Sequence, residues 1–204
     1  MAGLLSNFRN TMIVSFILAV IMIIAYAMGP QGTGEAFWQA VFRWLHVFFG
    51  ILWIGLLYYF NFVQIRKMPD IPAELKPAVS KYIAPEALFW FRWAALATWV
   101  MGVVLLISRG YFMEVVTLGM FGGFDPTGDQ SATLLGVGVW LATIMFFNVW
   151  VFIWPNQKIA LGLVEADADA KAKAGRLAML FSRTNTLLSV PMLVTMTMSQ
   201  TIFG

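Results

Sequence analysis

The sequence of 204 residues contains no cysteine, a single histidine and few charged residues. Without cysteine the chain can form no disulfide, no zinc–thiolate site, no iron–sulfur cluster and no covalently attached c-type haem. Charged residues make up 11% of the chain and apolar residues 60%, a balance that excludes a water-soluble enzyme. The net charge of +3 is small and its placement follows membrane topology, so no nucleic-acid partner is expected.

Five apolar runs are each long enough to cross a bilayer, which takes about 20 helical residues. The first run is longer than the apolar core of a signal peptide and lacks its cleavage site, so it is predicted to be a membrane helix. We therefore predict an all-α integral membrane protein, a single bundle of about five transmembrane helices. The predicted spans are 11–28, 36–64, 86–107, 131–154 and 177–203.

The remaining local features concern a bend and the connections between spans. Pro191 predicts a bend in the last span. Residues 73–83 are expected to form a loop because of the prolines around them. Residues 110–130 begin with an apolar part and end in Asp-Pro-Thr-Gly-Asp, which is typical of a hairpin or short helix followed by a turn. Residues 165–173 are rich in alanine, with acids before bases, and predict a solvated helix that extends the last span.

The lysines and arginines that flank the spans lie almost entirely on one side. The opposite side has only Arg109. Because cytoplasmic loops carry the excess of lysine and arginine, we predict a cytoplasmic N-terminus. The residues on that side are Arg9, Arg66, Lys67, Lys76, Lys81, Lys158, Lys171, Lys173 and Arg176.

Polar side chains within the second span form a first candidate site. Arg43, His46, Gly50 and Trp53 share one helical face through spacings of three, four and three residues. A neutral imidazole followed by a glycine could ligate the iron of a b-type haem, with Arg43 pairing with a propionate. Alternatively, His46 hydrogen-bonds across a helix interface, Arg43 reaches the outer headgroups and Gly50 permits close packing. A second axial ligand would have to be a methionine, come from another subunit or be absent.

A second candidate site lies toward the cytoplasmic ends of the spans. No aspartate or glutamate lies deep within any span, so the arginines there have no internal carboxylate. Their expected partners are amide carbonyls, lipid phosphates or a bound anion, and a planar anion or quinone headgroup would suit such a site. The anion- or lipid-binding set comprises Arg92, Arg183, Asn148, Asn156 and Asn185, with Asn61 and Gln64 of the second span at a similar depth.

Several functional motifs are missing. No glycine-rich phosphate loop opens a helix, and Gly136 with Gly138 is interpreted as a helix-packing seam. The single histidine has no acidic residue within its span to complete a Ser-His-Asp set. A small transporter is disfavoured because there is no buried carboxylate and no inverted repeat.

Four blocks follow one another through the last four spans: residues 44–55, 91–99, 148–157 and 182–192. Together they resemble the membrane domain of the bacterial membrane-bound urate oxidase (urate hydroxylase) family. The matching positions are His46, Gly50, Trp53, Gly55, Arg92, Thr98, Asn148, Trp154, Pro155, Asn156, Arg183, Asn185 and Pro191.

The resemblance implies a multi-pass redox protein of the bacterial inner membrane that takes electrons from a small substrate, urate in the family, or from a quinol. Family members carry a C-terminal cytochrome c domain, whereas this sequence has no Cys-x-x-Cys-His motif, so a separate cytochrome c is the expected acceptor. A His-Gly-Gly-Gly-Phe-Tyr type of segment after the second span is also missing. These departures favour an alternative, a non-catalytic transmembrane subunit that packs against and stabilises a larger membrane complex. Whether the chain is an enzyme is left open, and membrane lipids are partners in either case.

Overall fold

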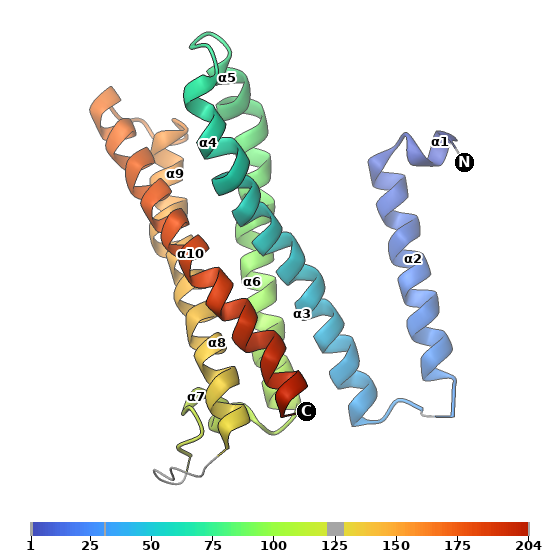
Figure 1. Cartoon of the computed structure of the whole chain (residues 1–204). Coiled ribbons are helices and arrows are strands. Elements are labelled where there is room, and N and C mark those ends of the chain that lie inside the picture. Colours follow the sequence, from blue (N-terminus) through green and yellow to red (C-terminus); the bar gives the residue numbers. More distant parts are fainter. Residues whose placement is uncertain (1, 31, 122–128, 204) are drawn as a thin grey trace.

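The computed structural model describes residues 2–30, 32–121 and 129–203, and all regular structure in this part of the chain is helical (Figure 1). Five helices among the described residues are long and apolar enough to cross a membrane, which agrees with the number and order of the apolar runs in the sequence. They are Phe8–Ala27, Glu35–Asp70, Lys76–Ser108, Gln130–Ala160 and Ala168–Ile202.

Three of these long helices contain segments of different helical type. The second joins α3 (Glu35–Tyr58), a π-helix (Tyr59–Gln64), α4 (Ile65–Lys67) and a 3₁₀ turn (Met68–Asp70). The third joins α5 (Lys76–Ala78), a π-helix (Val79–Ile83) and α6 (Ala84–Ser108). The fourth joins α8 (Gln130–Phe147), a π-helix (Asn148–Ile153) and α9 (Trp154–Ala160). The remaining helices are α1 (Ala2–Leu5), α2 (Phe8–Ala27), α7 (Phe112–Val116) and α10 (Ala168–Ile202).

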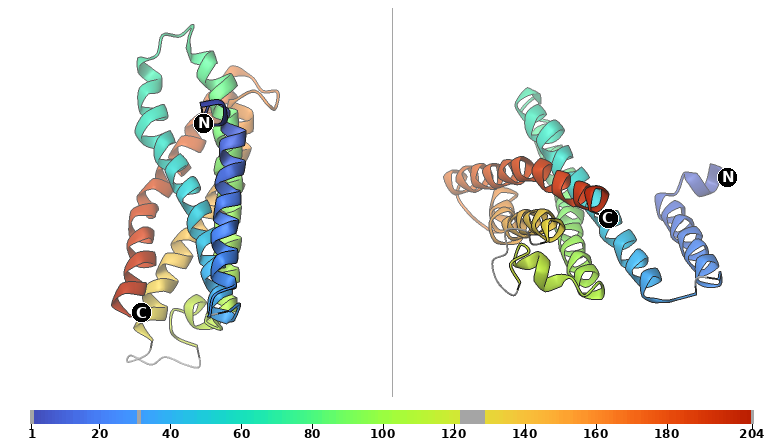
Figure 2. Two further views of the ribbon diagram at one scale, coloured as in Figure 1. Left: turned by 90° about the vertical axis from the view of Figure 1, so that its right-hand side faces the viewer. Right: turned by 60° about the horizontal axis from the view of Figure 1, so that its bottom comes forward.

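Four of the long helices form a bundle in which α3 packs on α6 and α10 packs on α8 and α9 (Figure 1). The buried core lies between them and includes Trp53, Leu57, Phe91, Met145 and Val149. The first helix, α2, stands apart from this bundle (Figure 2) and has no buried residue. One ring contact joins α2 to α3, between Phe16 and Phe48, whose centroids are 5.5 Å apart.

The bundle helices are 31 to 36 residues long. At 1.5 Å per residue this is about 45–55 Å, well over the roughly 30 Å of a hydrocarbon core. The connections rich in lysine and arginine lie at the same end of the bundle as the N-terminus, and the C-terminus lies at the other end (Figure 1). The alternating direction of the helices thus gathers the cationic connections at one end.

The loop predicted for residues 73–83 is wrong, because helix begins at Lys76. Pro77 lies in the first turn of α5, where a proline costs no hydrogen bond. Pro85 follows the π-helix Val79–Ile83, and Pro155 follows the π-helix Asn148–Ile153 in the same way. A proline removes one backbone donor, and the wider π turn accommodates that loss within a continuous helix.

Other local predictions are confirmed. The short helix α7 lies within 110–130, while positions 125–128 of the predicted turn lie outside the described residues. The alanine-rich segment forms the start of α10, where the Asp167 side chain accepts a hydrogen bond from the N–H of Ala170.

Two further predictions have a different outcome. The boundary predicted for the second span was too short, because this helix continues to Asp70. The bend at Pro191 stays a prediction, and α10 is one continuous helix through that residue.

The packing seam predicted at Gly136 and Gly138 is present, with the two glycines facing different neighbours. A Cβ at Gly136 would overlap the carbonyl oxygen of Val115 in α7, and a Cβ at Gly138 would overlap the hydroxyl of Thr195 in α10. Both contacts therefore require the absence of a side chain on α8.

A polar contact fastens the connection between α6 and α8 outside the long helices. The Tyr111 hydroxyl donates a hydrogen bond to the carboxylate of Asp129, which also caps α8 by accepting from the N–H of Ala132. Burial raises the pKa of Asp129, but the hydrogen bonds from Tyr111, Ala132 and Ser131 outweigh it, so this pKa lies below its ordinary value. Burial raises the pKa of Tyr111, and the hydrogen bond to Asp129 adds to that.

These shifts predict a pH-dependent stability that Tyr111→Phe should reduce. The contribution of Asp129 is complete above the unfolded carboxyl pKa of about 3.9 and is lost as pH falls through the lower folded value. The contribution of Tyr111 is complete below about pH 10 and is lost as pH rises further. Because Asp129 is exposed and Tyr111 only partly buried, each effect should stay below about 1 kcal/mol. Melting temperatures of wild type and variant in detergent, from pH 3 to 11, test this, and parallel curves would contradict it.

Candidate functional site

The imidazole of His46 lies in the interface between α3 and α6. Its Nδ1 is 2.9 Å from the backbone oxygen of Thr98. A carbonyl oxygen can only accept, so Nδ1 carries the proton and Nε2 of the neutral ring is left with a lone pair. A Cβ on Gly102 would lie 3.0 Å from Cε1 of His46, so glycine at this position of α6 makes room for the ring.

The residues around His46 fit a b-type haem in one respect only. A histidine that donates from Nδ1 to a backbone carbonyl has the tautomer of an iron ligand. However, the space beside Gly50 is taken by the Thr98 methyl group, 3.7 Å from a Cβ built there, and Gly102 is covered by the imidazole itself. Trp53 is only 1% exposed in the core. The two glycines therefore serve the packing of α3 on α6 and leave no slot for a macrocycle at this face.

We expect no His46-dependent b-type band in a dithionite-reduced minus oxidised spectrum of the purified chain. The space beside Gly50 and Gly102 is already occupied by the Thr98 methyl group and by the imidazole itself. His46→Ala should leave the visible spectrum unchanged and lower the melting temperature through the loss of the bond to Thr98. Pyridine haemochrome quantitation against protein concentration is the check. About one b-type haem per chain, lost in His46→Ala, would instead show that His46 holds a haem.

Arg43 lies on the exposed side of α3. It lines a shallow hollow of about 520 Å³, to which His46 does not contribute. The structure therefore places Arg43 and His46 in different surroundings, although their spacing had predicted one shared site. The other residues around the hollow are Ala36, Gln39, Ala40, Trp44 and Val47.

Two buried asparagines join α10 to the fourth long helix. The side-chain amide of Asn148 donates to the side-chain oxygen of Asn185 at 2.8 Å, and the amide of Asn185 donates to the backbone oxygen of Met145 at 2.9 Å. Asn185 is 0% exposed. Two of the predicted polar residues are therefore partners of each other.

A second set of polar contacts joins α10 to the end of α3 and the π-helix after it. The amide of Asn61 donates to the Ser182 hydroxyl and to the backbone oxygen of Leu57, both at 2.9 Å. One turn away, the Tyr58 and Ser189 hydroxyls are 3.0 Å apart. Together with Asn148 and Asn185, the residues Tyr58, Asn61, Ser182 and Ser189 are here termed the polar core.

Four buried polar atoms in the second and fourth long helices have no hydrogen-bond partner among the described residues. They are the indole nitrogens of Trp53 and Trp150 and the amide oxygens of Asn61 and Gln64. Leaving a buried polar group unpaired costs about 1–3 kcal/mol, so such atoms indicate a bound water or ligand. Three of them lie on π-helical segments, which are frequent at functional sites.

The predicted arginine pair is not brought together by any described contact. The Arg92 guanidinium of α6 stacks on the Trp154 ring of α9, with Cζ 3.8 Å from the ring centroid. Arg183 is exposed on α10. Asn156 donates to the Phe152 carbonyl of its own helix at 2.8 Å and does not join the polar core.

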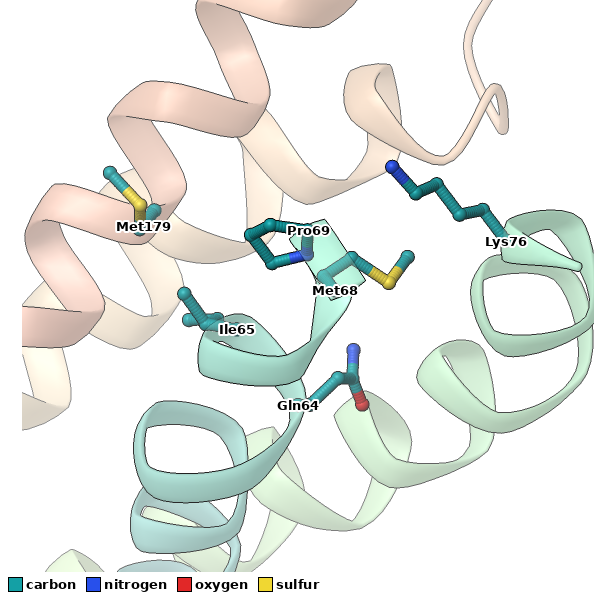
Figure 3. Close-up of a pocket in the computed structure, with 6 residues that line it drawn as sticks. All are labelled: Gln64, Ile65, Met68, Pro69, Lys76 and Met179. Carbon is teal, nitrogen blue, oxygen red and sulfur yellow. The ribbon is translucent and has the colours of Figure 1, made fainter. Parts of the chain in front are cut away.

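A hollow of about 490 Å³ opens between the N-terminal-side ends of the bundle helices. Gln64 and Ile65 approach it from the second long helix, Lys76 from the start of the third and Met179 from α10 (Figure 3). The unpaired amide oxygen of Gln64 belongs to this lining. The hollow therefore adjoins the π-helix that carries Asn61.

The sequence interpretation did not single out Tyr58, Ser182 or Ser189. A signal for the two serines was present, because small polar residues recur along α10 at spacings of three, four, six and four, which keep one helical face, and small residues mark intramembrane helix contacts. The buried members of this series are Ser182, Asn185, Ser189, Thr195 and Ser199.

A family model described as urate oxidase N-terminal matches residues 115–201. This stretch runs from α7 through α8 and α9 to the end of α10, so it contains Asn148 and Asn185 but neither His46 nor Arg92. The resemblance is thus supported for the last two of the four sequence blocks. No curated protein and no solved structure matches the chain.

Proposed function

We propose that this chain is a multi-pass redox protein of the bacterial inner membrane, with a cytoplasmic N-terminus, that passes electrons from a small substrate or quinol to a separate cytochrome c. The polar core is the proposed substrate site. A quinol bound there gives up two electrons and two protons, and two molecules of ferric cytochrome c each accept one electron.

The observation that carries this proposal is the set of unpaired buried donors and acceptors on the second and fourth long helices, which also carry Tyr58, Asn61 and Asn148 of the polar core. Indole N–H groups match carbonyl oxygens of a planar substrate, and amide oxygens match its N–H or O–H groups. The urate oxidase N-terminal match over residues 115–201 supports it, since that stretch includes four of the six residues of the polar core. Nine cationic residues at the N-terminal end support a cytoplasmic location for that end.

The test is the reduction of cytochrome c by membranes that contain the chain, with urate or a quinol as donor. Asn61→Ala should lower the rate about tenfold or more, because it removes an unpaired acceptor and the bond to Ser182. Thr184→Ala is the matched control, since Thr184 is exposed and bonds only its own helix at Leu180. Donor-independent rates, or equal rates in Asn61→Ala and wild type, would contradict the proposal.

One observation favours the second candidate, a non-catalytic subunit of a larger complex. Helix α2 has no buried residue, and the ring pair Phe16–Phe48 joins it to α3. In a complex, that helix would pack against a partner chain. A stoichiometric partner that co-purifies in mild detergent, together with no donor-dependent cytochrome c reduction, would favour this function over the first.

A further inference from the structure

We infer that Arg92, Trp154 and Lys158 form a binding site for the phosphodiester headgroup of an anionic membrane lipid, at the membrane surface on the N-terminal side. The inference rests on the proposed membrane placement and is independent of the proposed redox activity.

The site is built around one indole ring. The guanidinium carbon of Arg92 lies 3.8 Å from the centroid of Trp154 and 5.3 Å from that of Phe89. Lys158, one turn after Trp154 on α9, places its ammonium nitrogen 5.7 Å from the same indole. Two cations from two helices therefore meet around a single aromatic side chain.

The hydrogen-bonding capacity of Arg92 is unused within the part of the chain that the structure describes. No hydrogen bond or ion pair is found there for its guanidinium, and the single salt bridge of that part joins Lys67 to Asp70. Stacking on a ring occupies the faces of a guanidinium and leaves its N–H edges pointing outward in the plane. Those edges match two phosphate oxygens in a bidentate arrangement.

The depth of the site identifies the source of the phosphate. Arg92 precedes Arg109, the C-cap of α6, by 17 residues, which is about 25 Å of helix. With the far end of α6 at one surface of a roughly 30 Å hydrocarbon core, Arg92 lies just inside the other. Its side chain then reaches the headgroup layer, and exposed Trp90 and Trp93 beside it are typical of that layer.

The test uses the purified full-length chain and native mass spectrometry at graded phosphatidylglycerol concentrations. We expect bound phosphatidylglycerol in wild type, an apparent Kd about tenfold higher in Arg92→Gln, and a smaller increase in Lys158→Gln. Arg176→Gln is the matched control, an exposed cation on α10 outside the candidate sites, and should change the Kd less than twofold.

Two further arms separate the sources of the anion. Phosphatidylcholine should bind more weakly than phosphatidylglycerol, because its choline cation faces Arg92 and Lys158. Millimolar inorganic phosphate should leave the bound lipid in place, and displacement of the lipid would assign the site to a soluble anion and overturn the inference. An unchanged Kd in Arg92→Gln would also overturn it. Should Arg92→Gln fail to fold by circular dichroism, an unchanged Kd in Lys158→Gln has the same meaning.

Discussion

Gly136→Ala is expected to destabilise the protein by about 3 kcal/mol, because the added methyl group would overlap the backbone oxygen of Val115. A backbone atom cannot rotate away, so α7 and α8 would have to separate. Val115 is fully buried in a small cluster with Leu106 and Ala132, and that cluster would open. Unfolding in mixed detergent micelles, followed by circular dichroism, measures the loss.

The variants Gly138→Ala and Gly55→Ala serve as comparisons for Gly136→Ala. In Gly138→Ala the overlap is with the Thr195 hydroxyl, a side-chain group that can shift, so we expect a loss of only about 1 kcal/mol. Gly55→Ala meets nothing within 4 Å, so only the gain in helix propensity remains and we expect a stabilisation of up to about 1 kcal/mol. All three variants gain the same helix propensity, so their differences isolate packing. Equal stability of Gly136→Ala and Gly55→Ala would contradict the packing of α7 on α8.

Asn185→Leu is expected to cost about 2–3 kcal/mol. It removes the acceptor for Asn148 and the donor to Met145 while leaving the Asn148 amide buried without a partner. Because Asn185 belongs to the proposed substrate site, donor-dependent cytochrome c reduction should fall at least tenfold. Reversible unfolding and the cytochrome c assay measure the two effects on the same preparation.

The pairing of the two asparagines is tested by a double-mutant cycle. Asn148→Leu combined with Asn185→Leu leaves neither amide behind, so the double variant should be more stable than the sum of the single losses by about 1 kcal/mol. Thr184→Val, on the exposed side of α10, should be close to neutral and serves as control. Strict additivity would mean that the two side chains do not depend on each other.

The residue spacing around His46 in α3 predicted one part of its surroundings and left another part open. Spacing alone predicted correctly that His46 and Gly50 share a face, since both turn toward α6. It left open what lies opposite them, and that was decided by Thr98 and Gly102, with Thr98 52 positions further along the chain. The same holds for Arg92, whose stacking partner Trp154 lies on a helix that no local pattern connects to α6.

The sequence by itself determined the five long helices, their order and the side on which the cationic connections gather. A helix satisfies its own backbone hydrogen bonds, so an apolar run of sufficient length defines it without help from the rest of the chain. Only the tertiary structure decided the polar core, the π-helical segments and which side chains occupy the space beside Gly50 and Gly102. These features depend on contacts between residues far apart in the sequence, such as Tyr58 with Ser189 across 131 positions. In a bundle of uniformly apolar helices, side-chain shape and a few hydrogen bonds select the helix faces that meet.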